Sequence, residues 1–88
     1  MAQHKSAEKR ARQSLKQRDR NRGIASRVKT RVKQFRAAAE SGDAAATSEA
    51  LRLAEGELRR AASKGVLPAS RVNRQVARLA RFAQRASE

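Results

Sequence analysis

The chain has 88 residues and carries 22 Lys and Arg against 8 Asp and Glu, so its formal net charge is +14 at pH 7. It has no Cys and one His, His4, which excludes a disulfide framework, thiolate and histidine metal sites, and catalytic triads that use histidine. The length allows one domain, and no apolar run approaches the about 20 residues that a membrane-spanning helix needs.

Residues that favour helices dominate the whole chain, and no run of β-branched or aromatic side chains alternates with the period of a strand. Residues 41–43 interrupt the pattern with a Gly and an Asp that suits a helix N-cap. Residues 64–68 interrupt it again, with a Gly that suits a helix C-terminus and a Pro that suits a first turn. The sequence therefore predicts helices near residues 6–40, 44–63 and 69–86. Short connections make them an all-α, three-helix antiparallel bundle with a long, extended basic first helix.

The first predicted helix has two halves that differ in what they can bury. Its second half carries an apolar stripe at steps of three and four, made of Ile24/Ala25, Val28, Val32, Phe35 and Ala39. Between Lys5 and Gly23 the only large apolar side chain is Leu15. Because a helix turns by about 100° per residue, Leu15 points away from that stripe. We therefore expect a single domain, 1–88, in which a basic arm, 1–23, extends beyond a bundle, 24–86.

Most of the surplus positive charge lies in this first helix. Residues 1–36 hold 13 basic and 2 acidic residues. Such a segment repels itself in water, whereas Arg binds phosphate oxygens through paired hydrogen bonds and Lys binds them as a point charge. The sequence predicts that an anionic partner orders the basic arm.

The second predicted helix is nearly neutral and has its own buried stripe, made of Thr47, Leu51, Ala54, Leu58 and Ala61. Its three Glu residues are spaced as surface partners for nearby Arg side chains, rather than as the acid and base of an enzyme. No Ser in the chain has a base to activate it. The sequence predicts no enzyme activity, no cofactor, no metal and no small-molecule substrate.

The third predicted helix presents two opposite faces. One face packs through Val72, Val76, Leu79, Phe82/Ala83 and Ala86, and the other carries five Arg at steps of three and four. A solvated face normally mixes charge signs, but this one has no acidic residue before Glu88. We therefore expect the Arg row to bind a polyanion.

The number and position of the aromatic residues limit which kinds of polyanion the chain can recognise. The chain has no Trp or Tyr, and Phe35 and Phe82 lie on or beside the packing stripes, so both are expected in the core. Base-stacking sheet modules are thus excluded, and recognition of phosphates and shape in folded RNA or in duplex DNA remains. An amphipathic helix on anionic lipid needs several large apolar residues on one face of the arm, and Leu15 alone does not supply them.

Short motifs along the chain resemble one family. Lys5-Ser6-Ala7-Glu8-Lys9-Arg10-Ala11-Arg12, Arg20-Asn21, and Ser26-Arg27-Val28-Lys29-Thr30 with Lys33 look like the long first helix of the protein-twenty family of the bacterial small ribosomal subunit. Gly42-Asp43, Lys64-Gly65-Val66-Leu67 and Arg74…Arg78-Leu79-Ala80-Arg81 continue the match in register. The resemblance covers about Gln3 to Ala83.

The resemblance implies a cytoplasmic, structural protein of the small ribosomal subunit that binds 16S ribosomal RNA directly, clamps neighbouring RNA helices during assembly, and has few or no protein neighbours. The alternative is a nucleoid-type protein that binds duplex DNA, which composition alone does not exclude.

By motif position, the resemblance places RNA contacts on Lys5, Ser6, Lys9, Arg10, Arg12, Arg20, Asn21, Ser26, Lys29, Thr30, Lys33, Lys64, Arg74 and Arg78. The basic arm and the Arg row add Lys16, Arg22, Arg27, Arg71, Arg81 and Arg85. The N-terminus lacks the apolar stretch of a secretory signal, which also fits a cytoplasmic location.

Overall fold

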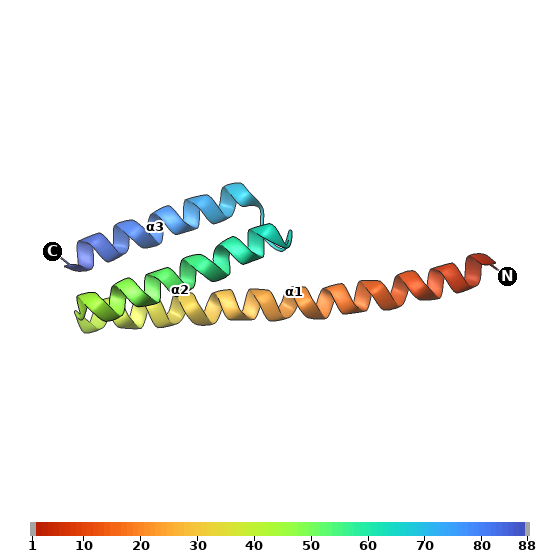
Figure 1. Cartoon of the computed structure of the whole chain (residues 1–88), viewed down its shortest axis with the longest axis horizontal. Helices are drawn as coiled ribbons and strands as arrows, with labels where there is room; N and C mark the ends of the chain where they lie inside the picture. Colours follow the sequence, from red (N-terminus) through yellow and green to blue (C-terminus); the bar gives the residue numbers. More distant parts are fainter. Residues whose placement is uncertain (1, 88) are drawn as a thin grey trace.

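The computed structural model describes the backbone of residues 2–87 and the side chains of residues 5–86, so the side chain of His4 lies outside the described part. The described chain forms three helices joined by two short turns (Figure 1). Their bounds are α1 Ala2–Ser41, α2 Ala44–Ser63 and α3 Ala69–Ser87. The predicted all-α fold with a long first helix is confirmed, and both predicted interruptions are the observed turns.

Each turn is set by local chemistry that the sequence displays. Asp43 is the N-cap of α2, where its carboxylate accepts hydrogen bonds from the backbone N–H groups of Ala45 at 3.0 Å and Ala46 at 3.2 Å. Gly42 and Gly65 have φ angles of +78° and +75°, a left-handed conformation that favours glycine. These positions stop α1 and α2 and reverse the chain.

The N-cap of α2 yields a stability prediction. Asp43→Ala removes the acceptor of two backbone donors and is expected to lower the free energy of unfolding by about 0.5–2 kcal/mol. Asp43→Asn keeps an acceptor at the same place and should lose much less. Thermal unfolding followed by circular dichroism measures both variants, and equal losses would contradict a capping role.

The core is built from the three predicted stripes. Phe35, Ala54, Leu58 and Ala61 are completely buried, and the Ala residues let α2 approach its neighbours closely. The Thr47 hydroxyl, also buried, donates to the backbone carbonyls of Ala38 at 3.1 Å and Asp43 at 2.7 Å. The other buried side chains are Ile24, Val28, Ala39, Val72 and Leu79.

The packing of α3 corrects two expectations, because Ala86 and Phe82, both predicted for its packing face, are exposed. Phe82, predicted for the core, is 45% exposed, and its ring meets Phe35 edge-on with the centroids 6.0 Å apart. The reason is that α3 packs mainly on α2 and contacts α1 over a smaller area (Figure 1). Ala83 lies on the side of α3 that faces α2. Phe82 lies on the side that faces α1, where the looser contact between α1 and α3 leaves its ring exposed.

The N-terminal half of α1 extends away from the other helices. Every side chain from residue 5 to residue 20 is exposed, including Leu15 at 58%, and the first buried one belongs to Ile24. The molecule is consequently elongated, with extents of 66 × 21 × 13 Å (Figure 1). Over the described residues, no helix combines the length and apolar character required to cross a membrane.

Candidate nucleic-acid interface

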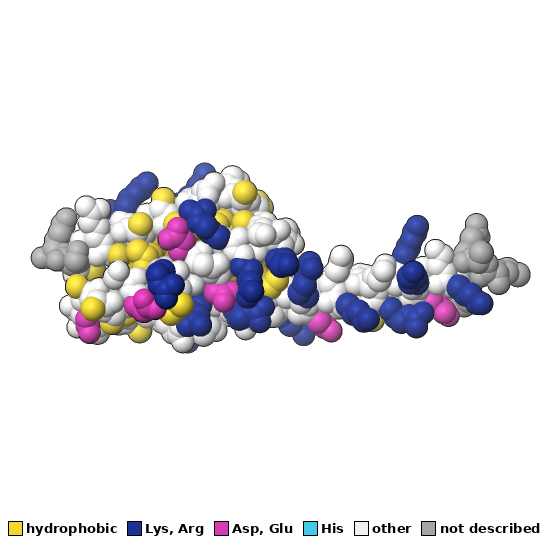
Figure 2. Space-filling view, in the orientation of Figure 1, with side chains coloured by type: hydrophobic (Ala, Val, Ile, Leu, Met, Phe, Trp, Pro, Cys, Tyr) yellow, Lys and Arg dark blue, Asp and Glu magenta, His cyan; other side chains and the backbone are white. Residues whose placement is uncertain are grey.

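On the face formed by α2, positive charge is matched by carboxylates from the same chain. Arg52 donates to Glu49, with Nη2 2.6 Å from Oε1, and this hydrogen bond holds the pKa of the Glu49 carboxyl below its usual value. Arg59 and Glu55 form a second pair at 3.2 Å. Figure 2 shows acidic and basic side chains next to one another over this part of the bundle. This face therefore has little need of an external anion.

Arg27 of α1 also pairs with a carboxylate of α2. Its Nε lies 3.9 Å from Oε2 of Glu57, a carboxylate whose side chain is only 17% exposed. That oxygen is buried and has no hydrogen-bond partner in the described structure, so the positive charge of Arg27 is what balances its negative charge. Arg27 was predicted to contact RNA, but its guanidinium already pairs with a carboxylate of the same chain.

Between α1 and α3 the charge balance is different. Three adjoining depressions lie there, of about 220, 350 and 360 Å³. Arg36 lines all three, and neighbouring depressions share Gln75, Arg78 or Leu79, so together they form one continuous surface, the α1–α3 groove. Its lining consists of Val28, Lys29, Val32, Lys33, Phe35, Arg36, Glu40, Arg71, Arg74, Gln75, Arg78, Leu79 and Phe82.

The groove concentrates unmatched positive charge. Its six cations are all exposed, and none of them forms an ion pair with another described residue. Among the described residues that line it, only Glu40 carries a carboxylate. Cations held side by side without acids attract a polyanion, because the polyanion releases its own counterions when they neutralise it. The six are Lys29, Lys33, Arg36, Arg71, Arg74 and Arg78.

The groove joins two sets of residues that the sequence placed far apart. Lys29 and Lys33 come from α1, and Arg71, Arg74 and Arg78 come from the Arg row of α3. Five predicted contacts therefore line one surface. Arg81 and Arg85 continue the row along α3 and are exposed, as is Lys64 in the second turn.

Arg36 is the residue that the sequence reasoning missed. It lines every part of the groove and faces the Arg row of α3. A signal was present, because Lys29, Lys33 and Arg36 are spaced by four and three and so share one side of α1.

The basic arm carries a second row of cations. Lys5, Lys9, Arg12, Lys16 and Arg20 follow one another at steps of three and four, so they lie on one side of α1. All are exposed and form no ion pair within residues 5–86. At about 100° per residue, this row lies about 130° around the helix from the groove cations of α1. The chain thus presents cations in two directions.

The remaining predicted contacts lie on or near the arm, and two of them have local partners. The Thr30 hydroxyl donates to the Ser26 carbonyl at 3.0 Å, and Arg20 donates to Oδ1 of Asn21 at 3.4 Å. Asn21 is half-buried. The others are exposed and form no described ion pair: Ser6, Arg10 and Arg22.

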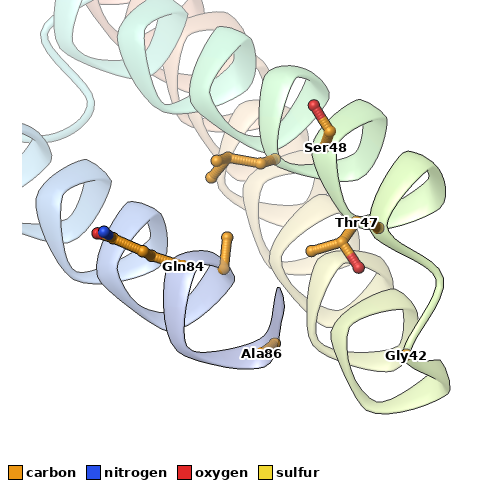
Figure 3. A pocket seen from close by; sticks show the side chains of 8 residues that line it. Gly42, Thr47, Ser48, Gln84 and Ala86 are labelled. Carbon is orange, nitrogen blue, oxygen red and sulfur yellow. The ribbon is translucent and has the colours of Figure 1, made fainter. Parts of the chain in front are cut away.

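A further pocket, between α2 and α3, differs from the groove. Its volume is about 230 Å³, and Thr47, Ser48 and Gln84 are its polar lining residues (Figure 3). Its other lining residues are Gly42, Ala44, Leu51, Ala83 and Ala86. Since this lining carries no charge, the pocket adds nothing to anion binding.

Comparison with known proteins gives a consistent result. The model of the family described as "Ribosomal protein S20" matches residues 2–84. A protein of Wolinella succinogenes named "Small ribosomal subunit protein bS20" is 47% identical over 79 residues, which are 90% of this chain and 87% of that protein. Proteins of the same name from Campylobacter jejuni and Anaeromyxobacter sp. are 45% and 48% identical over 91% and 94% of this chain, and the alignments cover 92% and 91% of those proteins.

Proposed function

The chain belongs to the ribosomal protein S20 family, and we propose that it is a structural component of the small ribosomal subunit that binds 16S ribosomal RNA directly. Ribosomal proteins of this family are structural components and not enzymes. The place of action is accordingly the ribosome, in the cytoplasm.

One observation carries the RNA-binding part of the proposal: the six groove cations are exposed and unmatched, whereas on the α2 face Arg52 and Arg59 pair with Glu. A protein that needed charge only for solubility would mix both signs over its whole surface. Segregation of the surplus cations on the α1–α3 side and on the basic arm supports two RNA-binding surfaces.

The mechanism is charge neutralisation in two directions. RNA helices repel each other through their phosphates, and each guanidinium binds phosphate oxygens through two parallel hydrogen bonds. The arm row holds one RNA segment, and the groove holds another on a different side of α1. One small protein then brings together two RNA segments that would otherwise separate.

A competition experiment tests this function. Labelled small-subunit ribosomal RNA is bound to the protein on filters and displaced by unlabelled RNA or by duplex DNA of equal length, at several salt concentrations. Ribosomal RNA is expected to compete at least about tenfold better than the DNA. Contacts to about 6–10 phosphates predict a slope of log K against log salt between about −4 and −9. Equal competition by both would favour the alternative, a nucleoid-type DNA-binding protein.

A further inference from the structure

The exposed ring of Phe82 is unusual on this surface. Among the described residues, Phe82 and Leu15 are the only large hydrophobic side chains that are exposed. Leu15 lies alone on the arm, but Phe82 lies at one end of the cationic α1–α3 groove. A surface with an aromatic ring beside unmatched guanidinium groups suits a ligand that has both an apolar part and an anionic part.

The end of the groove has the size and walls of a binding site. The depression measures about 360 Å³, at the lower end of the roughly 300–1,000 Å³ that is common for ligand sites. Phe35 is completely buried and meets the Phe82 ring edge-on, with an angle of 64° between the ring planes. This contact holds the Phe82 ring from one side and leaves the rest of it open.

The other lining groups correspond to the parts of a nucleotide. The exposed Phe82 ring gives an apolar surface on which a base stacks, and the buried Phe35 and Leu79 side chains support it from behind. Arg36 and Arg78 supply guanidinium groups for its phosphate. Glu40 supplies a carboxylate, which accepts hydrogen bonds from exocyclic amino groups such as that of cytosine and repels a phosphate.

We propose that this end of the groove accepts one unpaired RNA base, stacked on Phe82, with its amino edge toward Glu40 and its phosphate toward Arg36 and Arg78. The proposal rests on the proposed function and adds a base contact to phosphate binding. Charge favours this occupant over a second copy of the chain, because a copy carrying +14 would bring its own cations against the groove cations. Bases with an exocyclic amino group should be preferred to uracil, which has none.

The first test uses fluorescence of the full chain. The sequence contains no Trp or Tyr, so Phe82→Trp introduces a single reporter. Small-subunit ribosomal RNA is expected to quench most of its emission by stacking, whereas inorganic polyphosphate, a polyanion without bases, should bind and leave the emission nearly unchanged. Leu15→Trp is the matched control, since it is also exposed next to cations, and its response should be the same with both polyanions.

The second test uses affinity for the same RNA. Phe82→Ala is expected to weaken binding about 5- to 150-fold, the range found for loss of one stacked base, while the salt slope stays unchanged. Phe82→Leu keeps an apolar side chain but no ring, so it should lose nearly as much. Circular dichroism should show unchanged helicity, because Phe82 is not in the core.

The outcomes separate this inference from the proposed function. Equal quenching of Phe82→Trp by RNA and polyphosphate, or unchanged affinity of Phe82→Ala, would overturn base binding and leave rRNA binding by phosphate contacts intact. Failure of the unaltered chain to prefer ribosomal RNA would overturn the proposed function itself. Emission of Phe82→Trp that changes with protein concentration before RNA is added would assign the surface to a second copy and contradict the base site.

Discussion

Replacing Arg36, Arg74 and Arg78 together by Ala is expected to weaken binding of small-subunit ribosomal RNA on the order of 100-fold. Each exposed guanidinium–phosphate contact contributes about 1 kcal/mol, and about 3 kcal/mol corresponds to two decades in affinity. Each lost phosphate contact also reduces the steepness of log K against log salt by about one, so the slope should become shallower by about three. Filter binding at four or more salt concentrations measures both quantities.

The matched control removes the same charge elsewhere. Replacing Arg52, Arg59 and Arg60 by Ala also lowers the net charge by three, but these side chains belong to the α2 face, where Arg52 and Arg59 already pair with Glu. Ala favours helix at all six positions, so neither triple variant should lose helicity. The control should bind within a few fold of the parent and keep its salt slope. Equal losses in the two variants would show that net charge, and not the groove, determines RNA binding.

Replacing Phe35 by Ala is expected to lower the free energy of unfolding by about 3–5 kcal/mol, because the side chain is completely buried and a cavity would remain. Domains of this size have a total stability on the order of 5–15 kcal/mol, so the loss removes a large share of it. Phe35 also supports the ring of Phe82, so the variant should loosen the contact between α1 and α3. Urea unfolding followed by circular dichroism measures the change.

Leu15 provides the matched control for a large-to-small substitution. It lies on the same helix but is 58% exposed, so Leu15→Ala should change the stability by less than about 0.5 kcal/mol. Similar destabilisation by both substitutions would mean that the arm packs against the bundle, contrary to the structure.

The helices and most of the core could be predicted from the sequence because local signals determine them. Asp43 caps α2 with its own side chain, and Gly42 and Gly65 adopt the positive φ angles that favour glycine. Apolar side chains at steps of three and four fixed the buried face of each helix. The predicted stripes therefore contain every residue that is buried in the described structure, from Ile24 to Leu79.

The α1–α3 groove could not be predicted, because it depends on which side of the α1–α2 pair receives α3. Stripes show that each helix has a buried face, but they do not determine the hand in which three helices close. The spacing of Arg36 puts it on the same side of α1 as two predicted contacts, but nothing in the sequence places it opposite Arg74 and Arg78. Phe82 was misassigned for a related reason: the stripe allowed either residue 82 or residue 83 to face inward, and α3 turns Ala83 toward α2.

The continuity of α1 has a consequence for how the arm keeps its helical form. Starting a helix is its most costly step, because several residues must be fixed before the first hydrogen bond forms, whereas each further residue adds a bond of its own. The bundle holds the C-terminal half of α1, so the starting turn is already in place when RNA arrives. Turns of the arm that open at the N-terminal end can therefore re-form one residue at a time, without a separate initiation event.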